Sequence, residues 1–132
     1  RRFYEFAEVQ LTPENMEIIA QFAALAARMH EQGILHRDFS PGNILFDQVE
    51  GKWHFSLVDT NRMYFGPVSV RRGCENFARL WGQTCFFELL ALKYAEARGA
   101  NAADCLKWML AARKKFWSRY IRRHGRPFAI DL

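Results

Sequence analysis

The feature that most constrains the fold of this chain is a polar loop held between a long helical pattern and a short apolar strand pattern. Residues 35–46 read LHRDFSPGNILF, so a turn-forming Pro-Gly pair separates the two patterns. Upstream, the Thr-Pro pair at residues 12–13 is typical of a helix start. Apolar residues then recur at helical spacing until Gly33, where we expect the helix to end. The loop should therefore be fixed at both ends by buried structure.

A second strand after this loop predicts a hairpin. Residues 47–52 contain Gly51 and carry turn chemistry, and residues 53–58 alternate apolar and polar side chains before Asp59. Because the second strand of a hairpin runs back along the first, we expect Asp59 to lie beside the loop of residues 36–43.

The rest of the chain is expected to be mainly helical. We expect a short extended strand over residues 1–10, including Val9, a loop over residues 60–73, and helices over residues 74–98 and 102–124, separated at Gly99 or Asn101. This pattern predicts a single α+β unit over residues 1–132, mostly α, with one hairpin.

Composition supports a packed domain and narrows its partners. Half of the 132 residues are hydrophobic and 12 are Phe, which predicts a core built on large rings. The net charge of +5 favours anionic partners such as nucleotide phosphates or an acidic membrane surface, without choosing among them.

Cysteine spacing and hydropathy exclude several classes of protein. Cys74, Cys85 and Cys105 form no CxxC pair, so neither a zinc knuckle nor a disulfide framework is indicated, and we expect reduced thiols. No signal peptide is present, and no segment approaches the ~20 apolar residues that span a bilayer. We therefore expect a soluble protein of the cytoplasm.

Three polar residues form the candidate catalytic constellation. Asp38 is suited to accept or orient the proton of an attacking hydroxyl, which is the role of a general base. Asn43 and Asp59 offer an amide and a carboxylate, the oxygen ligands that Mg²⁺ takes in phosphoryl transfer. Taken singly, Asp38 could instead cap a turn and Asp59 could be a turn former at the strand end. The predicted helix before the loop and the predicted hairpin after it favour the interpretation that these residues act together in catalysis.

The string His36-Arg37-Asp38-x-x-x-x-Asn43 resembles the catalytic loop of protein-kinase-like enzymes. Residues 12–73 are similar to their C-terminal lobe. More narrowly, they resemble the bacterial lipopolysaccharide core kinases, which phosphorylate Kdo or heptose sugars. In those enzymes the second metal-binding aspartate begins an Asp-Leu-His-Arg-like string, and here residues 59–62 read DTNR. The resemblance implies ATP and Mg²⁺ as cofactors and a sugar hydroxyl as the acceptor.

Two differences from protein Ser/Thr kinases bear on which molecule accepts the phosphoryl group. Ser40 stands where protein Ser/Thr kinases usually carry a Lys, and the Ser-Pro-Gly-Asn wording is closer to aminoglycoside and choline phosphotransferases. A protein Ser/Thr kinase would need a longer activation segment than residues 60–73 provide. A non-catalytic scaffold that binds an anionic surface is the alternative outside enzymes.

The sequence contains no Gly-rich phosphate loop, no strand Lys and no helix to supply its Glu partner, which are the parts of a kinase N-lobe. We therefore expect a C-lobe without its N-lobe. Alone, these 132 residues should bind ATP weakly and show little turnover.

Supporting roles follow from the same resemblance. We expect His36 to pack and hydrogen-bond so that it steadies the loop, and Arg37 to form an ion pair at the surface or within the lobe. For Arg62, contact with a substrate phosphate and pairing with an acid stay equally open.

The end of the last helix is strongly basic and aromatic. Its seven cations are Arg113, Lys114, Lys115, Arg119, Arg122, Arg123 and Arg126. A solvated helix face is one interpretation, and docking to anionic lipid or lipopolysaccharide at the inner membrane is the other. Trp117 and Phe116 are expected in the core, and no nucleic-acid-binding signature is present.

Overall fold

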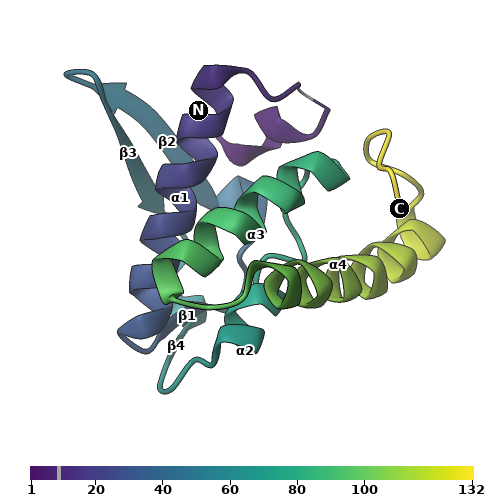
Figure 1. Ribbon diagram of the computed structural model, residues 1–132. Helices are drawn as coiled ribbons and strands as arrows, with labels where there is room; N and C mark the ends of the chain where they lie inside the picture. The colour runs from purple at the N-terminus through teal and green to yellow at the C-terminus, as the bar shows by residue number, and fades with distance from the viewer. Residues whose placement is uncertain (9) are drawn as a thin grey trace.

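The computed structural model describes residues 1–8 and 10–132 and shows a mostly helical α+β fold, as the sequence predicts (Figure 1). The α-helices are α1 (Pro13–Glu31), α2 (Val70–Glu75), α3 (Thr84–Arg98) and α4 (Ala102–His124), the strands are β1 (Ile34–His36), β2 (Ile44–Val49), β3 (Lys52–Leu57) and β4 (Met63–Phe65), and the short 3₁₀ helices are η1 (Phe3–Phe6), η2 (Pro41–Asn43) and η3 (Thr60–Arg62). No helix in the described part of the chain is both long and apolar enough to cross a bilayer.

Helix α1 begins and ends where the sequence signals predict. The Thr12 hydroxyl accepts a hydrogen bond from the Asn15 backbone N–H at 3.2 Å, and Pro13 occupies the first helical position. Past the last turn, Gly33 has φ +78°, a conformation that other residues rarely adopt. A Cβ there would also lie 2.9 Å from the Gly66 carbonyl oxygen, so both geometry and space select glycine.

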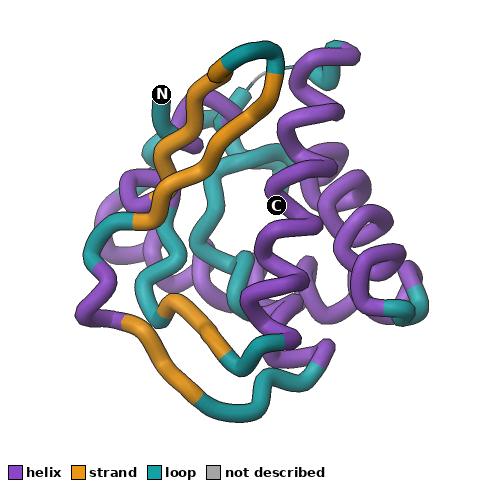
Figure 2. The backbone as a smooth tube through the Cα atoms, turned by 90° about the vertical axis from the view of Figure 1, so that its left-hand side faces the viewer, coloured by secondary structure: helices purple, strands orange, loops and turns teal. Residues whose placement is uncertain are grey.

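Two small antiparallel sheets flank the predicted catalytic loop (Figure 2). In the β2–β3 hairpin, Ile44 faces Leu57 and Phe46 faces Phe55, and these residues turn towards the core. The alternate positions, among them Leu45 opposite Ser56, face outwards. The second sheet pairs β1 with β4 and places Leu35 opposite Tyr64. The loop between β1 and β2 is thus anchored in both sheets.

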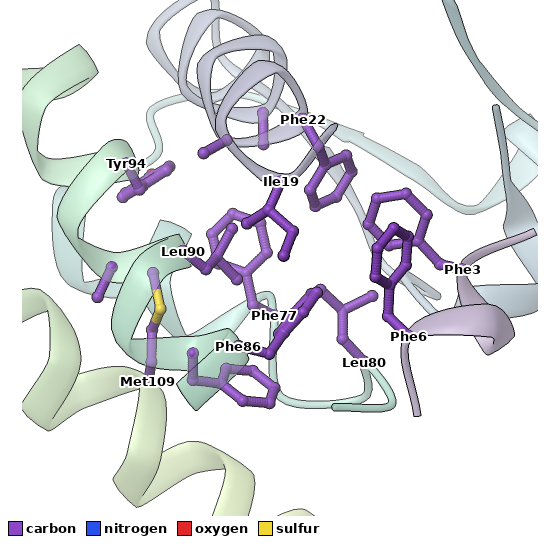
Figure 3. Close-up of a cluster of buried hydrophobic side chains, with 14 of the residues drawn as sticks. Phe3, Phe6, Ile19, Phe22, Phe77, Leu80, Phe86, Leu90, Tyr94 and Met109 are labelled. Atoms are coloured by element: carbon purple, nitrogen blue, oxygen red, sulfur yellow. The ribbon is translucent and has the colours of Figure 1, made fainter. Parts of the chain in front are cut away.

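The core lies where η1, α1, α3 and the hairpin meet, and it is built on aromatic rings (Figure 3). Phe3 packs against Phe22 with ring centres 4.4 Å apart, and Phe77 packs edge-on against Tyr94 at 5.2 Å. These side chains are buried, and burying a side chain of this size contributes about 1.5–3 kcal/mol. The abundance of Phe therefore serves a core that fixes α1 and the hairpin.

Two predictions of local structure, for the first ten residues and for residues 60–73, are wrong. Residues 1–8 and residue 10 do not form a strand; Phe3 and Phe6 are both buried at a spacing that suits the 3₁₀ helix η1. Val9, which that prediction included, lies outside the described residues. Residues 60–73 are not all loop, since they hold η3, β4 and the start of α2. The pairing of β4 with β1 is non-local, so composition within the segment does not reveal it.

The helix predicted over residues 74–98 is interrupted. Residues 76–83 divide it into α2 and α3. The helix predicted over residues 102–124 has the bounds expected. Tertiary contacts cause the break, because the Gln83 amide donates to the Ala7 and Ala129 carbonyls and accepts from the Asp131 backbone N–H. These bonds join the two ends of the chain at the N-terminus of α3.

The C-terminal residues are tied to α4 by a buried arginine. Arg113 is 3% exposed and donates to the Asp131 carboxylate at 2.7 Å and to the Gly82 carbonyl at 3.0 Å. Partial burial acts to raise the pKa of Asp131, but hydrogen bonds from Thr84 and Arg113 outweigh it and hold this pKa below its ordinary value. Arg113 is therefore structural and does not belong to the solvated basic face.

Trp117 is buried as predicted, whereas Phe116, which was expected in the core with it, is only half-buried. Cys74 and Cys105 are buried and Cys85 is exposed, and all three are free. Burial raises the pKa of the Cys74 thiol far above its ordinary value, which makes this thiol unreactive.

Candidate active site

His36 fixes the conformation of the loop that carries Asp38. Its imidazole is fully buried at the end of β1. The Asp38 backbone N–H donates to His36 Nδ1 at 3.0 Å, so Nδ1 carries no proton. His36 Nε2–H therefore donates to the Val58 carbonyl at 2.8 Å. One ring joins the residue before Asp59 to the backbone of Asp38, which is the steadying arrangement that the sequence predicts.

Asn43 forms a second connection between the same two segments. Its Nδ2 donates to the Asp38 carbonyl at 2.8 Å, and its own carbonyl accepts from the Val58 N–H at 3.0 Å. The amide nitrogen is thus occupied within the loop, and Oδ1 is the atom that is left as an acceptor. Hydrogen bonds thus hold the loop that carries Asp38 and Asn43 to the segment that carries Asp59.

Asp59 lies at the end of β3 in a left-handed conformation, with φ 60° and ψ 48°. A non-glycine residue in this region is uncommon, and such conformations cluster at functional sites. The side chain is exposed and does not cap η3, although the residue occupies the N-cap position. Its carboxylate is therefore presented to solvent at the open end of the hairpin, beside the loop and opposite the turn, where it is open to a cation.

The Asp38 carboxylate has a partner that the sequence did not suggest. Arg79, in the segment between α2 and α3, donates to Asp38 Oδ1 at 3.2 Å. Both side chains are partly exposed, so this ion pair contributes at most about 1 kcal/mol to stability. No local signal could have revealed it, because residues 74–98 were expected to form one continuous helix.

A buried chain of hydrogen bonds links this loop to the helical core. The Asn76 Nδ2 donates to the His36 carbonyl at 2.9 Å, so Asn76 Oδ1 is the atom that accepts from His30 Nε2 at 3.0 Å. His30 Nδ1 in turn accepts from the Tyr94 hydroxyl at 2.7 Å. Every donor meets an acceptor along this path, which stabilises one arrangement of the loop.

His30 itself is held neutral inside this chain. Burial lowers its pKa to about 4, and the nearby Arg98 acts in the same direction, although the bond with Asn76 opposes them. Asn76 and His30 are therefore positioning groups that sequence reasoning missed.

The structure also places the three other supporting residues that the sequence suggested, which are Arg37, Arg62 and Ser40. Arg37 forms no ion pair with a described residue, so that prediction is wrong, and its guanidinium lies 5.8 Å from the centre of the Tyr64 ring instead. Its backbone N–H donates to the Arg62 carbonyl at 2.8 Å. Arg62 is exposed at the end of η3. Ser40 precedes η2 without a side-chain cap, and its carbonyl accepts from the Asn43 N–H.

The donor set at the site suits magnesium. Among residues 1–8 and 10–132, no three His, Cys, Asp or Glu side chains are grouped to hold a metal ion alone. Asn43 Oδ1 and the Asp59 carboxylate are hard oxygen donors, and Mg²⁺ is usually held by one or two carboxylates together with substrate phosphates and waters. These residues therefore fit a metal that arrives with a nucleotide.

A cleft lies on the outer face of the β2–β3 hairpin. Its volume is about 320 Å³, and its lining residues are Arg1, Leu45, Phe46, Asp47, Val49, His54 and Ser56. Leu45, two residues after Asn43 in the chain, contributes an apolar side chain to this cleft.

Comparison with known proteins agrees with this geometry. The family described as lipopolysaccharide kinase (Kdo/WaaP) matches residues 6–88, more than half of the chain, and this match covers residues 36–43 and Asp59. A Caenorhabditis elegans protein whose name describes it as a ribosomal protein S6 kinase alpha-2 is 28% identical over 92 residues, which are 69% of this chain and 11% of that protein. The chain thus spans about a tenth of the length of this curated relative. The fold is that of a kinase-like C-terminal lobe, as predicted from residues 12–73.

Proposed function

The chain belongs to the lipopolysaccharide kinase (Kdo/WaaP) family, and from this premise we propose that it is the catalytic lobe of an ATP-dependent phosphotransferase acting on a lipopolysaccharide core sugar. The observation that carries the proposal is the double link of Asn43 to the Asp38 carbonyl and the Val58 N–H. This link holds a base candidate and two oxygen ligands in one short stretch of surface.

Each of the three residues has a distinct proposed role. Asp38 orients the acceptor hydroxyl and takes its proton as the oxygen attacks phosphorus. Asn43 Oδ1 and the Asp59 carboxylate hold Mg²⁺. Bound MgATP would supply the γ-phosphoryl group, with ADP as the leaving group, and the charge neutralisation. Dependence on ATP places the proposed activity in the cytoplasm, and lipopolysaccharide as acceptor places it at the inner membrane.

The segment that follows Asp59 favours a small acceptor over a protein substrate. Residues 60–65 are taken up by η3 and β4, and α2 begins at Val70. This leaves little chain for the long activation segment and peptide groove of a regulated protein kinase. Aminoglycoside-type and choline-type acceptors stay as the alternatives within the same chemistry.

The test is loss of phosphotransfer in the intact protein that contains this chain. We expect Asp38→Asn to lower kcat for transfer from ATP to lipopolysaccharide core oligosaccharide by about 10²–10⁴-fold, the usual contribution of a general base. Asp59→Asn should raise the Mg²⁺ concentration needed for activity. Asp104→Asn is the matched control, because Asp104 is an exposed aspartate in the first turn of α4.

Three outcomes decide the assignment. Activity that survives Asp38→Asn would refute the role of this base. Activity on an aminoglycoside, choline or a protein, with none on core oligosaccharide, would replace the acceptor. Absence of ATP consumption, with unchanged binding to an anionic surface in every variant, would favour the scaffold.

A further inference from the structure

A cationic cavity opens beside the Asp38 ion pair, on the exposed side of α4. Its volume is about 210 Å³, and it is lined by Arg79, Phe116, Arg119, Tyr120, Arg123 and His124. Three guanidinium groups and an imidazole therefore surround a space with no acidic side chain in its lining. Nothing in the phosphotransfer machinery described above uses these residues except Arg79.

Arg79 connects this cavity directly to the candidate base. Its NH1 group donates to Asp38 Oδ1 at 3.2 Å, and its guanidinium carbon lies 5.3 Å from the centre of the Phe116 ring. One side chain thus touches both the Asp38 carboxylate and the cavity wall. A molecule held in the cavity would lie within the reach of one arginine from Asp38.

The cavity carries positive charge that the described protein does not neutralise. Arg119 and Arg123 are exposed, and neither forms an ion pair with an acid among the residues that the structure describes. A neighbouring cavity of about 230 Å³ shares Phe116 and Arg119 and adds Lys115. Its one acid, Glu75, lies 3.9 Å from Arg71. Arginine groups in this setting are suited to grip phosphate or carboxylate oxygens through paired N–H groups.

The wall between these cations is aromatic. The Phe116 and Tyr120 rings are stacked with centres 6.1 Å apart, and the His124 ring lies 4.7 Å from the Tyr120 ring. Phe116 and Tyr120 are only half-buried, so part of each ring faces the cavity. An apolar ring face offers contact area to the C–H groups of a sugar, while the cations bind its charged substituent.

We propose that this cavity is the acceptor subsite, and that it binds a sugar bearing a phosphate or carboxylate group so that a hydroxyl of that sugar lies at Asp38. The inference rests on the proposed function, because it names the site for the acceptor of that reaction. Arg119 and Arg123 hold the anionic substituent, and Arg79 bridges between the bound sugar and Asp38.

Binding, measured by calorimetry on the intact protein without ATP, tests this subsite separately from catalysis. The probes are a hexose 6-phosphate, the corresponding hexuronic acid, the neutral hexose and inorganic phosphate. We expect both anionic sugars to bind at least about tenfold more tightly than the neutral hexose, which corresponds to about 1.4 kcal/mol. The double variant R119Q/R123Q should lose this preference.

The matched control is K114Q/R122Q. It removes the same charge from the same helix, at exposed positions that line neither cavity, and should change affinity less than twofold. Circular dichroism checks that all variants fold. Binding that follows Arg119 and Arg123 while phosphotransfer is absent would refute the proposed function and leave an anionic-sugar site.

Four results would overturn the subsite. One is the absence of measurable binding of either anionic sugar at concentrations up to about 10 mM, since a dissociation constant above this value corresponds to less than about 3 kcal/mol of binding free energy. A second is equal loss in both double variants. A third is inorganic phosphate that binds as tightly as the sugar phosphate, which would indicate a phosphate site only. The last is unchanged sugar binding with lost binding to phosphatidylglycerol vesicles, which would assign these cations to a membrane surface.

Discussion

Replacing His36 by Phe isolates the contribution of one buried ring to the geometry of the catalytic loop. Phe has a similar shape and can keep the packing against Phe39, whose ring centre lies 6.0 Å from that of His36. It cannot accept from the Asp38 N–H at 3.0 Å or donate to the Val58 carbonyl at 2.8 Å. The change therefore removes two hydrogen bonds while it leaves apolar contact largely in place.

The expected cost is about 2–4 kcal/mol of the free energy of unfolding. Leaving one buried donor or acceptor unpaired costs about 1–3 kcal/mol, and two groups lose their partner here. Two such groups would together cost about 2–6 kcal/mol. Val58 is 38% exposed, so water can partly replace the hydrogen bond that its carbonyl loses, and the expected cost lies in the lower half of that range. For a domain of this size the melting temperature should fall by roughly 10 °C.

Urea unfolding followed by circular dichroism measures this loss, and hydrogen exchange at the Asp38 and Val58 amides reports whether the loop opens. His54→Phe is the matched control, since it makes the same change at an exposed position of β3 and should alter stability by less than about 0.5 kcal/mol. A loss for His36→Phe below about 1 kcal/mol, with unchanged exchange, would refute the argument that His36 joins the two segments.

Two further predictions concern the buried chain behind this loop. Burial lowers the pKa of His30 to about 4, while the pKa in the unfolded chain stays near 6.5, so between these pH values the unfolded state binds more protons than the folded state. The free energy of unfolding should therefore be at its full value above about pH 6.5 and fall by about 3 kcal/mol as the pH drops towards 4. Urea unfolding from pH 4 to 7 checks this, and His30→Gln should flatten the profile; a profile that stays equally steep would contradict it. A Cβ at Gly73 would overlap the Tyr94 hydroxyl and approach His30 Nδ1 to 2.8 Å, so Gly73→Ala should cost at least about 2 kcal/mol in thermal unfolding, by overpacking. Wild-type stability for Gly73→Ala would show that the polar chain can shift without cost.

Expectations drawn from short spans of sequence were accurate because their causes are local. Thr12 caps α1 through the backbone three residues on, and Gly33 ends it by adopting a positive φ. The hairpin follows from alternation over residues 44–57, with register set by a tight turn. Each of these signals acts within a few residues, so the helix, the hairpin and the loop between them could be predicted without the fold.

Expectations failed where a distant segment decides the conformation. Composition suggested a loop over residues 60–73, yet β4 forms because β1 offers it an edge. Periodicity suggested one helix over residues 74–98, yet Gln83 bonds to carbonyls near both termini of the chain. Arg113 looked like part of a solvated face and is instead buried against Asp131.

The sequence by itself determined the chemical identity of the candidate site, since Asp38, Asn43 and Asp59 lie in a pattern whose spacing brings the loop after a helix and the returning end of a hairpin together. Only the tertiary structure decided what surrounds these groups. Arg79 reaches Asp38 across 41 residues of chain, and Asn76 joins His36 to the helical core. Side-chain contacts between distant segments depend on how helices and sheets pack in three dimensions, and local propensity and spacing carry no information about that packing.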